Sequence, residues 1–112
     1  MIVGFSPASI HANVDPVHFD ASASTSVVTP IGWTLQYLGN VPRPSGIEDW
    51  LTLQANSNGT LFWDSLLFTT MDVFTLDVPA TTFAQAGAYR MLLQVNGDVS
   101  THQTYEYFYV DP

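Results

Sequence analysis

Residues 82–97, TFAQAGAYRMLLQVNG, place a glycine two positions before a tyrosine at the start of an alternating apolar run. From Tyr89 to Val95, apolar side chains recur at every second position, which is the period of a half-buried β-strand. The Asn96-Gly97 pair that follows is a strong short-range signal for a hairpin turn. We therefore expect Gly87 to turn the chain into a strand and the asparagine-glycine pair to end that strand.

The rest of the chain repeats the period of two, and no window shows the apolar stripe of an amphipathic helix. The sequence predicts strands at 8–14, 16–21, 32–38, 49–55, 60–68, 74–79, 88–95 and 101–110. In the run 74–79, Phe74, Leu76 and Val78 are expected to point inward. Turn-rich segments separate the runs at intervals of roughly 8–12 residues, as in β-sandwiches. We expect one all-β domain over residues 1–112, an antiparallel β-sandwich of about seven to nine strands.

The segment that follows Phe83 resembles the corner of immunoglobulin-type sandwiches, in which a tyrosine hydroxyl near the start of the penultimate strand bonds to the backbone upstream. Phe83 would be the apolar plug between two strands, and Gly87 and Tyr89 occupy the glycine and tyrosine places of the pattern. Met91 stands where those domains carry a disulfide cysteine, and Trp33 is in position to be the core tryptophan. The resemblance implies an immunoglobulin-like fold.

Two further stretches carry the resemblance. PVHFDASAST, 16–25, is similar to the opening strand and loop of polycystic-kidney-disease-type (PKD) domains, although the middle of the chain lacks their W-D-F-G-D-G stretch. A longer pattern resembles the first domain of phage baseplate upper proteins and is formed by Val78, Pro79, Phe83, Gly87, Tyr89, Ser100, Thr101, Phe108 and Val110. A cysteine-free, acidic β-protein that begins at its own methionine also looks like many phage capsid decoration proteins.

Charge is scarce and lopsided in this chain. Charged residues make up 11% of the sequence, against about 25% in ordinary soluble domains. Arg43 and Arg90 are the only cations, and they face ten carboxylates, for a formal net charge of −8. This balance argues against binding to nucleic acid and to anionic membranes, because both require a basic patch. We expect part of the uncharged surface to contact a partner protein.

Other sequence features indicate the cellular compartment in which the protein is made. The chain has no cysteine, so it forms neither disulfides nor thiolate metal sites. The opening MIVGFSPASI lacks the basic start and long apolar segment of a signal peptide, and no apolar run approaches the ~18 residues of a membrane span. These features predict a protein made in a cytoplasm, and the resemblance to phage structural proteins implies that it is located in the virion.

No catalytic or metal motif stands out. His11, His18 and His102 lack the close spacing of metal ligands, although Asp15 or Asp20 could join them. The carboxylates form no EF-hand loop, but loop carboxylates could still meet at one end of the sandwich and hold Ca²⁺. Nothing pairs two carboxylates for glycoside hydrolysis, and no serine sits in a nucleophile elbow. We expect a non-catalytic protein without metal or cofactor.

The last strand offers the more informative surface. In THQTYEYFYV, Tyr105, Tyr107 and Tyr109 share one face, while Phe108 and Val110 share the other. If Phe108 and Val110 point inward, the tyrosines form an exposed ladder, and Leu92 lies beside it if the last two strands pair. Tyrosine is enriched at protein interfaces, but the tyrosines could equally be core or solvated strand residues.

The N-terminal segment 1–7 is the other candidate contact. It is either the first strand or an arm that docks on another subunit through Ile2, Val3 and Phe5. We expect these side chains and the tyrosine ladder to bind viral capsid proteins, as in a capsid decoration (cement) protein. A tail or baseplate component, self-association, and a carbohydrate- or receptor-binding module that stacks sugars on Trp33, Trp50 or Trp63 remain alternatives.

Overall fold

The computed structural model describes residues 4–22, 30–55, 63–96 and 101–112. The strands are β1 (Gly4–Ser6), β2 (Ile10–His11), β3 (Val17–Asp20), β4 (Ile31–Gly39), β5 (Asp64–Met71), β6 (Thr75–Val78), β7 (Gly87–Asn96) and β8 (Thr101–Asp111). One α-helix, α1 (Ile47–Ala55), follows β4, and a 3₁₀ helix, η2 (Ala80–Phe83), precedes β7. The predicted all-β class is confirmed, with eight strands in the described residues.

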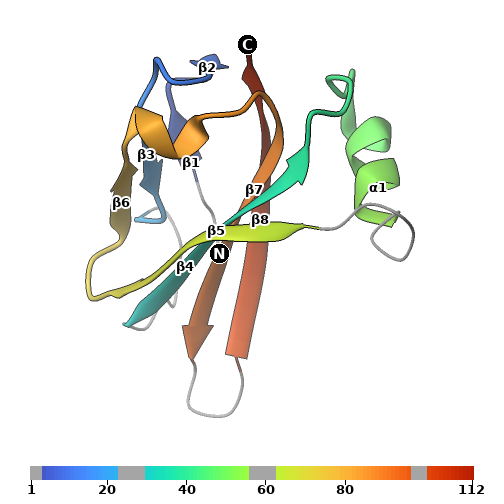
Figure 1. Cartoon of the computed structure of the whole chain (residues 1–112). Coiled ribbons are helices and arrows are strands. Elements are labelled where there is room, and N and C mark those ends of the chain that lie inside the picture. The colour runs from blue at the N-terminus through green and yellow to red at the C-terminus, as the bar shows by residue number, and fades with distance from the viewer. Residues whose placement is uncertain (1–3, 23–29, 56–62, 97–100) are drawn as a thin grey trace.

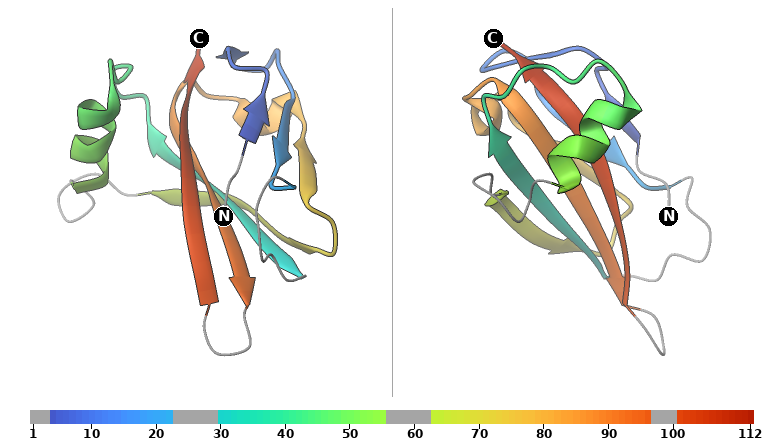
Figure 2. Two further views of the ribbon diagram at one scale, coloured as in Figure 1. Left: turned by 180° about the vertical axis from the view of Figure 1, so that it is seen from behind. Right: turned by 90° about the vertical axis from the view of Figure 1, so that its right-hand side faces the viewer.

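The strands form two sheets that face each other (Figure 1). A three-stranded sheet has the order β1-β3-β6, and a five-stranded sheet has the order β2-β8-β7-β4-β5. Every pairing is antiparallel except the short parallel pairing of β2 with β8. The three-stranded sheet lies on one side of β7 and β8, and α1 lies on the other side (Figure 2). The molecule is therefore the predicted β-sandwich, with a helix added outside the larger sheet.

The core lies between the two sheets and follows the alternation of the sequence. Along β4, the side chains of Ile31, Trp33 and Leu35 are fully buried, whereas the residues between them are only partly buried. Phe19 of the smaller sheet packs against Phe108 of the larger, with ring centroids 5.6 Å apart. Each fully buried side chain of this size contributes about 1.5–3 kcal/mol, so these inward faces dominate the stability of the sandwich.

The segment before β7 forms the expected tyrosine corner. The Tyr89 hydroxyl donates a hydrogen bond of 2.5 Å to the carbonyl of Gln85. Tyr37 reaches the same corner from β4 and donates to the carbonyl of Ala86 at 2.7 Å. The rings of the two tyrosines lie 4.6 Å apart, and Phe83 packs edge-on against Tyr89. Two strands are thus pinned to one connection, and burial raises the pKa of Tyr89 to about 12.

Gly87 is required at this corner for two reasons. Its φ angle of +142° is a conformation that side chains with a Cβ rarely adopt. A Cβ built on Gly87 would also lie 2.1 Å from the carbonyl oxygen of Gly39, at the end of β4. The backbones of β4 and β7 approach so closely here that only glycine fits.

One predicted strand is wrong, because residues 49–55 belong to α1. Glu48 and Asp49 lie in the first turn, where negative charge is favourable, and the Asp49 carboxylate accepts hydrogen bonds from the backbone N–H and the hydroxyl of Ser45. Leu51 and Leu53 alternate like strand residues, and the helical spacing of Ile47, Trp50 and Leu51 is too short a pattern to outweigh that alternation.

Most of the other predicted strands differ from the structure by one residue at one or both ends, and three predictions need a larger correction. In 8–14 only Ile10–His11 is strand, because Ala12–Val14 form a turn in which Asn13 has a φ angle of +61°. β5 extends to Met71 rather than ending at residue 68, and residues 60–62 of that predicted strand lie outside the described residues. Phe74 precedes β6 and is 37% exposed, so it does not point inward with Leu76 and Val78.

The N-terminal segment forms the first strand over Gly4–Ser6. β1 pairs with β3, with Phe5 opposite Phe19. The Phe5 ring packs 5.3 Å from the ring of Phe108 and belongs to the edge of the core. Ile2 and Val3 lie outside the described residues.

Candidate interaction surface

The outer face of the five-stranded sheet carries the predicted tyrosine ladder. Phe108 and Val110 are buried, so the tyrosines of β8 point away from the core. The pairing of β7 with β8 places Leu92 opposite Tyr105 and Arg90 opposite Tyr107. We name this surface the outer face; its described members include Gly32, Thr34, Gln36, Ser65, Phe68, Thr70, Arg90, Leu92, Gln94, Gln103, Tyr105, Tyr107, Tyr109 and Asp111.

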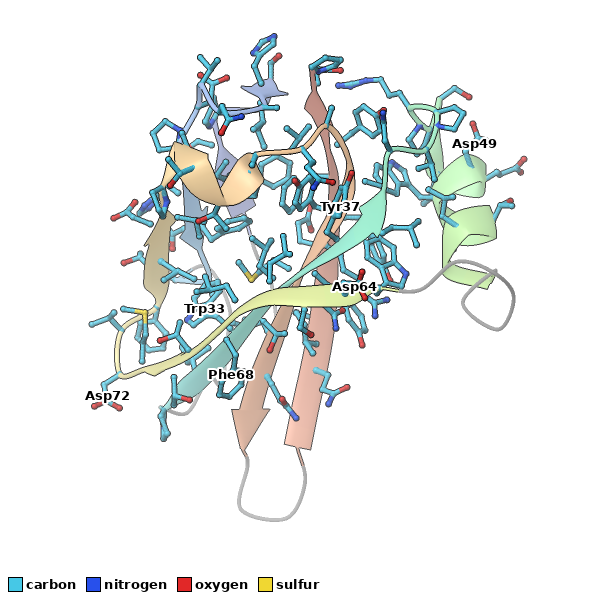
Figure 3. The ribbon with its side chains drawn as sticks, in the orientation of Figure 1. Trp33, Tyr37, Asp49, Asp64, Phe68 and Asp72 are labelled. Atoms are coloured by element: carbon cyan, nitrogen blue, oxygen red, sulfur yellow. The ribbon has the colours of Figure 1, made fainter. Side chains whose placement is uncertain are left out.

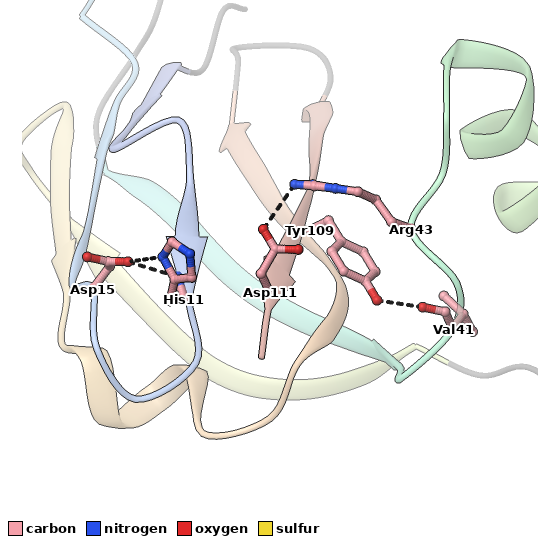
Figure 4. Close-up of polar contacts among 6 residues, drawn as sticks. All are labelled: His11, Asp15, Val41, Arg43, Tyr109 and Asp111. Atoms are coloured by element: carbon pink, nitrogen blue, oxygen red, sulfur yellow. Dashed lines mark hydrogen bonds and ion pairs between the residues drawn. The ribbon is translucent and has the colours of Figure 1, made fainter.

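One end of the outer face is covered by α1 and by the connection that leads to it. The Tyr107 ring lies 6.0 Å from the ring of Trp50 in α1 and 5.8 Å from that of Trp63. The Tyr109 hydroxyl donates a hydrogen bond of 2.7 Å to the carbonyl of Val41 (Figure 4). Tyr107 therefore holds α1 against the sheet and Tyr109 holds the connection that leads to it, and both rings are only partly available to a partner.

Arg43 reinforces the same end of the molecule. Its guanidinium lies 5.2 Å from the centre of the Tyr109 ring and donates to the carboxylate of Asp111 at 3.2 Å (Figure 4). An open groove of about 240 Å³ lies next to it and is lined by Val41, Pro42, Arg43, Pro44, Asp49, Thr52 and Leu53. Arg43, Asp49 and Thr52 are the polar side chains of this lining, and the other lining residues are apolar.

Arg90 forms a different arrangement at the middle of the outer face. Its guanidinium carbon lies 4.4 Å from the centre of the Trp63 ring and 4.3 Å from that of the Tyr105 ring. Its Nε–H donates a hydrogen bond of 2.5 Å to the side-chain carbonyl of Gln36, and the Gln36 amide donates in turn to Ser65 at 3.4 Å. We call these residues, Arg90 with Trp63, Tyr105 and Gln36, the arginine clamp.

The remainder of the outer face is open and uncharged among the described residues. Tyr105 is 38% exposed and Phe68 is 68% exposed. Beside Phe68, the absence of a side chain at Gly32 leaves a shallow hollow of about 180 Å³, which Thr70 and Gln94 also line. The outer face is therefore a surface of rings and of hydroxyl and amide groups, with a hollow near the end of the sheet where β4 begins.

Three carboxylates lie at separate places along the molecule. Figure 3 shows Asp49 on α1, Asp64 at the start of β5 and Asp72 after the end of β5. These three side chains do not point toward a common site. Among the described residues, no group of three histidine, cysteine, aspartate or glutamate side chains could hold a metal ion. The His102 side chain lies outside the described residues.

Two histidines pair with carboxylates on the surface. His11 lies 3.0 Å from Asp15 (Figure 4), and hydrogen bonds from the His11 backbone and ring hold the pKa of that carboxyl below its usual range. His18 lies 2.6 Å from Asp77 on the neighbouring strand, and the register puts Ser6 opposite His18 on the other side. This row has the residue types of a hydrolytic triad, but the Asp77 side chain is 85% exposed, so water would screen it and its hold on the histidine would be weak.

The structure brings together only part of the predicted contact set. Leu92 and the three tyrosines share the outer face, whereas Phe5 is packed at the core edge. Of the tryptophans proposed to stack on sugars, Trp33 is fully buried, Trp50 packs on Tyr107, and Trp63 lies under Arg90.

Sequence reasoning missed Arg90, Phe68 and the helix as parts of this surface. The alternation with Met91 in the sequence does place Arg90 outward, so its orientation could have been found. Its stacking on Trp63 could not, because that ring enters from another part of the chain.

Among the described residues, no helix is long and apolar enough to span a membrane. No family model, curated protein or solved structure matches this chain.

Proposed function

We propose that this chain is a non-catalytic structural protein of a virus particle that binds the capsid surface through the outer face. One observation carries the proposal. In a chain of net charge −8, the open part of the outer face has no carboxylate among its described residues and exposes Phe68 and Tyr105. An acidic protein that leaves one sheet face uncharged and aromatic has a surface suited to burial against another protein.

The mechanism would be adhesion without chemistry. A stable protein interface buries about 800 Å² on each partner, which corresponds to roughly one face of a small domain. The outer face would supply this contact, with aromatic rings at its centre. The carboxylates elsewhere would face solvent and keep the free protein from associating unspecifically.

Two alternatives remain. A tail or baseplate component would use the same face, so it differs only in the partner. A carbohydrate-binding module is less well supported, because stacking on a sugar ring needs an exposed tryptophan and each described tryptophan is buried or packed against its own chain.

The test begins with intact virus particles purified from the culture in which this gene is expressed. Quantitative mass spectrometry is expected to find the chain in a fixed ratio to the major capsid protein, and cryo-electron microscopy is expected to place the outer face against the capsid. Absence of the chain from the particles would overturn the proposal, and a position on the tail would favour the first alternative.

A pair of variants connects this test to the outer face. Phe68→Glu puts a charge on the outer face, whereas Ile47→Glu puts the same charge at a site that is 76% exposed on α1. We expect Phe68→Glu to reduce particle binding at least ten-fold and Ile47→Glu to change it less than two-fold. Equal effects of the two substitutions would exclude the outer face as the contact.

A further inference from the structure

We infer that the arginine clamp is the anchor for a carboxylate presented by the partner protein. The inference rests on the proposed function, since it names the chemistry by which the same face recognises its partner. The partner is expected to place one aspartate or glutamate side chain on Arg90, within an otherwise uncharged contact.

The first reason is that the guanidinium of Arg90 is held in place before any partner binds. Trp63 and Tyr105 contact it through their rings, and its Nε–H is bonded to Gln36. A guanidinium fixed in this way loses little conformational entropy when it forms further hydrogen bonds. None of the described contacts uses its terminal Nη groups, which form the fork that matches a carboxylate.

The second reason is that no carboxylate among the described residues pairs with Arg90. The chain has ten acidic residues and two arginines, and Arg43 is paired with Asp111. Among the described residues, no ion pair includes Arg90. Asp98 is the one acidic residue in the undescribed segments, and β7 continues for six residues beyond Arg90, or about 20 Å, before the chain reaches it.

The third reason is the setting of the clamp. Arg90 is the one charged residue among the described residues of the open part of the outer face, since Asp111 lies at the covered end and is paired with Arg43. The residues around Arg90 are aromatic, aliphatic, hydroxyl or amide in character. When a partner covers this face, water is excluded and the attraction between the guanidinium and a carboxylate becomes stronger. Tyrosine, tryptophan and arginine are also the residues most often found at energetic centres of interfaces.

A phosphate-bearing partner fits the surface less well than a carboxylate. Phosphate groups of nucleic acids or lipids bind where several cations converge, whereas the whole chain has two arginines and no lysine. The net charge of −8 would also repel a polyanion. A single carboxylate within an uncharged protein surface matches the single cation here.

The first experiment measures the clamp without any particle. Because the chain has two arginines, its ¹⁵N spectrum has at most two arginine Nε–H signals, and an Arg43→Lys variant assigns them. The probe is N-acetyl-aspartate methylamide, titrated at constant ionic strength, with N-acetyl-asparagine methylamide as the neutral control. We expect a saturable shift of the Arg90 signal and of the Trp63 indole signal, with a dissociation constant on the order of 10–100 mM.

The Arg43 signal is the internal reference, because Asp111 already occupies that guanidinium. If the Arg90 signal does not move, or moves equally with the asparagine compound, the inference is overturned. Addition of inorganic phosphate at the same ionic strength tests the other ligand class, and a tighter response to phosphate than to the aspartate compound would also overturn it.

The second experiment compares Arg90→Lys with Arg43→Lys in binding to the purified particles. Lysine retains the charge but lacks the planar fork, so we expect Arg90→Lys to weaken binding at least ten-fold and Arg43→Lys less than two-fold. Circular dichroism and the dispersion of the tryptophan indole signals check that both variants are folded.

The outcomes separate the two proposals. If the wild-type chain does not bind particles, the proposed function fails, and the titration alone decides whether Arg90 binds carboxylates. If the wild-type chain and Arg90→Lys bind equally well, the proposed function stands and the carboxylate anchor is rejected.

Discussion

At the scale of single residues, the corner before β7 combines a glycine that no other residue can replace with a tyrosine that pins the chain. Both could be predicted from the sequence, because Gly87 precedes the clear alternating run that Tyr89 begins. The contribution of Tyr37 to the same corner could not, since the bond from its hydroxyl to Ala86 joins residues 49 positions apart. The contacts of Arg90 with Trp63 and Gln36 could not be predicted for the same reason.

Replacing Gly87 by alanine is expected to destabilise the protein severely. The added Cβ would meet the Gly39 carbonyl oxygen at 2.1 Å, and the alanine backbone would have to adopt a φ angle of +142°. The strain and the displacement of β4 together should cost more than about 3 kcal/mol. Gly46→Ala is the control, because its added Cβ meets nothing within 4 Å. Urea unfolding of both variants measures the difference, and a Gly87→Ala variant as stable as Gly46→Ala would contradict the close approach.

Removing the Tyr89 hydroxyl is expected to cost roughly 1 kcal/mol, because the Gln85 carbonyl loses its donor. Tyr107→Phe serves as the control, since no described hydrogen bond uses the Tyr107 hydroxyl, and it should change the unfolding free energy by less than ~0.5 kcal/mol. Chemical denaturation at pH 7 distinguishes them. Equal losses would show that the corner bond contributes nothing specific.

The same hydroxyl predicts a response to alkaline pH. Burial raises the pKa of Tyr89 from 10.0 to about 12 in the folded chain. Between these values the unfolded chain has released the proton and the folded chain has kept it, so stability falls as the pH rises through this window. We expect the fall between pH 10 and 12 to be smaller in Tyr89→Phe than in the wild type. The comparison requires unfolding curves at several pH values for both proteins.

At the scale of elements, strands were predictable where they are central and the helix was not. β4, β7 and β8 alternate clearly because one face of each is buried in the core. α1 was mistaken for a strand because its apolar residues are few and its position is set by tertiary contacts, chiefly Trp50 on Tyr107. A nine-residue helix is too short to be stable alone, so the sequence signal for it is weak.

The start of α1 depends on Asp49, whose pKa lies below its usual range because Ser45 donates two hydrogen bonds to the carboxylate. Asp49→Asn removes the charge of the carboxylate at the helix start and weakens these bonds. We therefore expect a weaker helical signal in circular dichroism and a shift of the tryptophan emission, to which Trp50 contributes, to longer wavelength. The sandwich should stay folded, because α1 contributes no residue to the buried core cluster.

Acidification should act on the helix in the same direction. The lowered pKa means that the helix is favoured above the ordinary pKa of the carboxyl and is lost as the pH falls through the folded value. Glu48→Gln is the matched control, because no described hydrogen bond uses its carboxylate. Equal fluorescence changes in the two variants would show that the Ser45 bonds do not matter.

At the scale of the whole molecule, the charge is strongly unbalanced. Three ion pairs occur among the described residues, two of them with histidine, against a net charge of −8. Repulsion between carboxylates should therefore outweigh attraction at neutral pH, and salt should screen it. We expect the melting temperature at pH 7 to rise by a few degrees between 10 and 200 mM NaCl.

The same measurement near pH 4.2, the isoelectric point given by the sequence, provides the control. The net charge is then close to zero, so salt should have little effect. A melting temperature that falls with salt at pH 7 would mean that attractive pairs dominate instead.

The sandwich as a whole could be predicted because period-two alternation and turn spacing depend only on local sequence. The order of strands and the composition of the outer face could not, since they depend on which strands pair. Leu92 and the tyrosines of β8 lie on one face, as predicted, because β7 and β8 are consecutive strands that pair antiparallel. Phe68 was missed because β5 joins the sheet from the opposite edge.

The close approach of Gly87 to Gly39 also has an evolutionary consequence. Substitution of Gly87 requires a different ending of β4, so descendants of this sequence should keep glycine at that position whatever they bind. Position 90 is under no such constraint from the backbone, and it should change when the partner changes. Gly87 and Arg90 lie in the same strand, β7. Comparing how often each position is substituted among related sequences would therefore separate conservation of the fold from conservation of the binding partner.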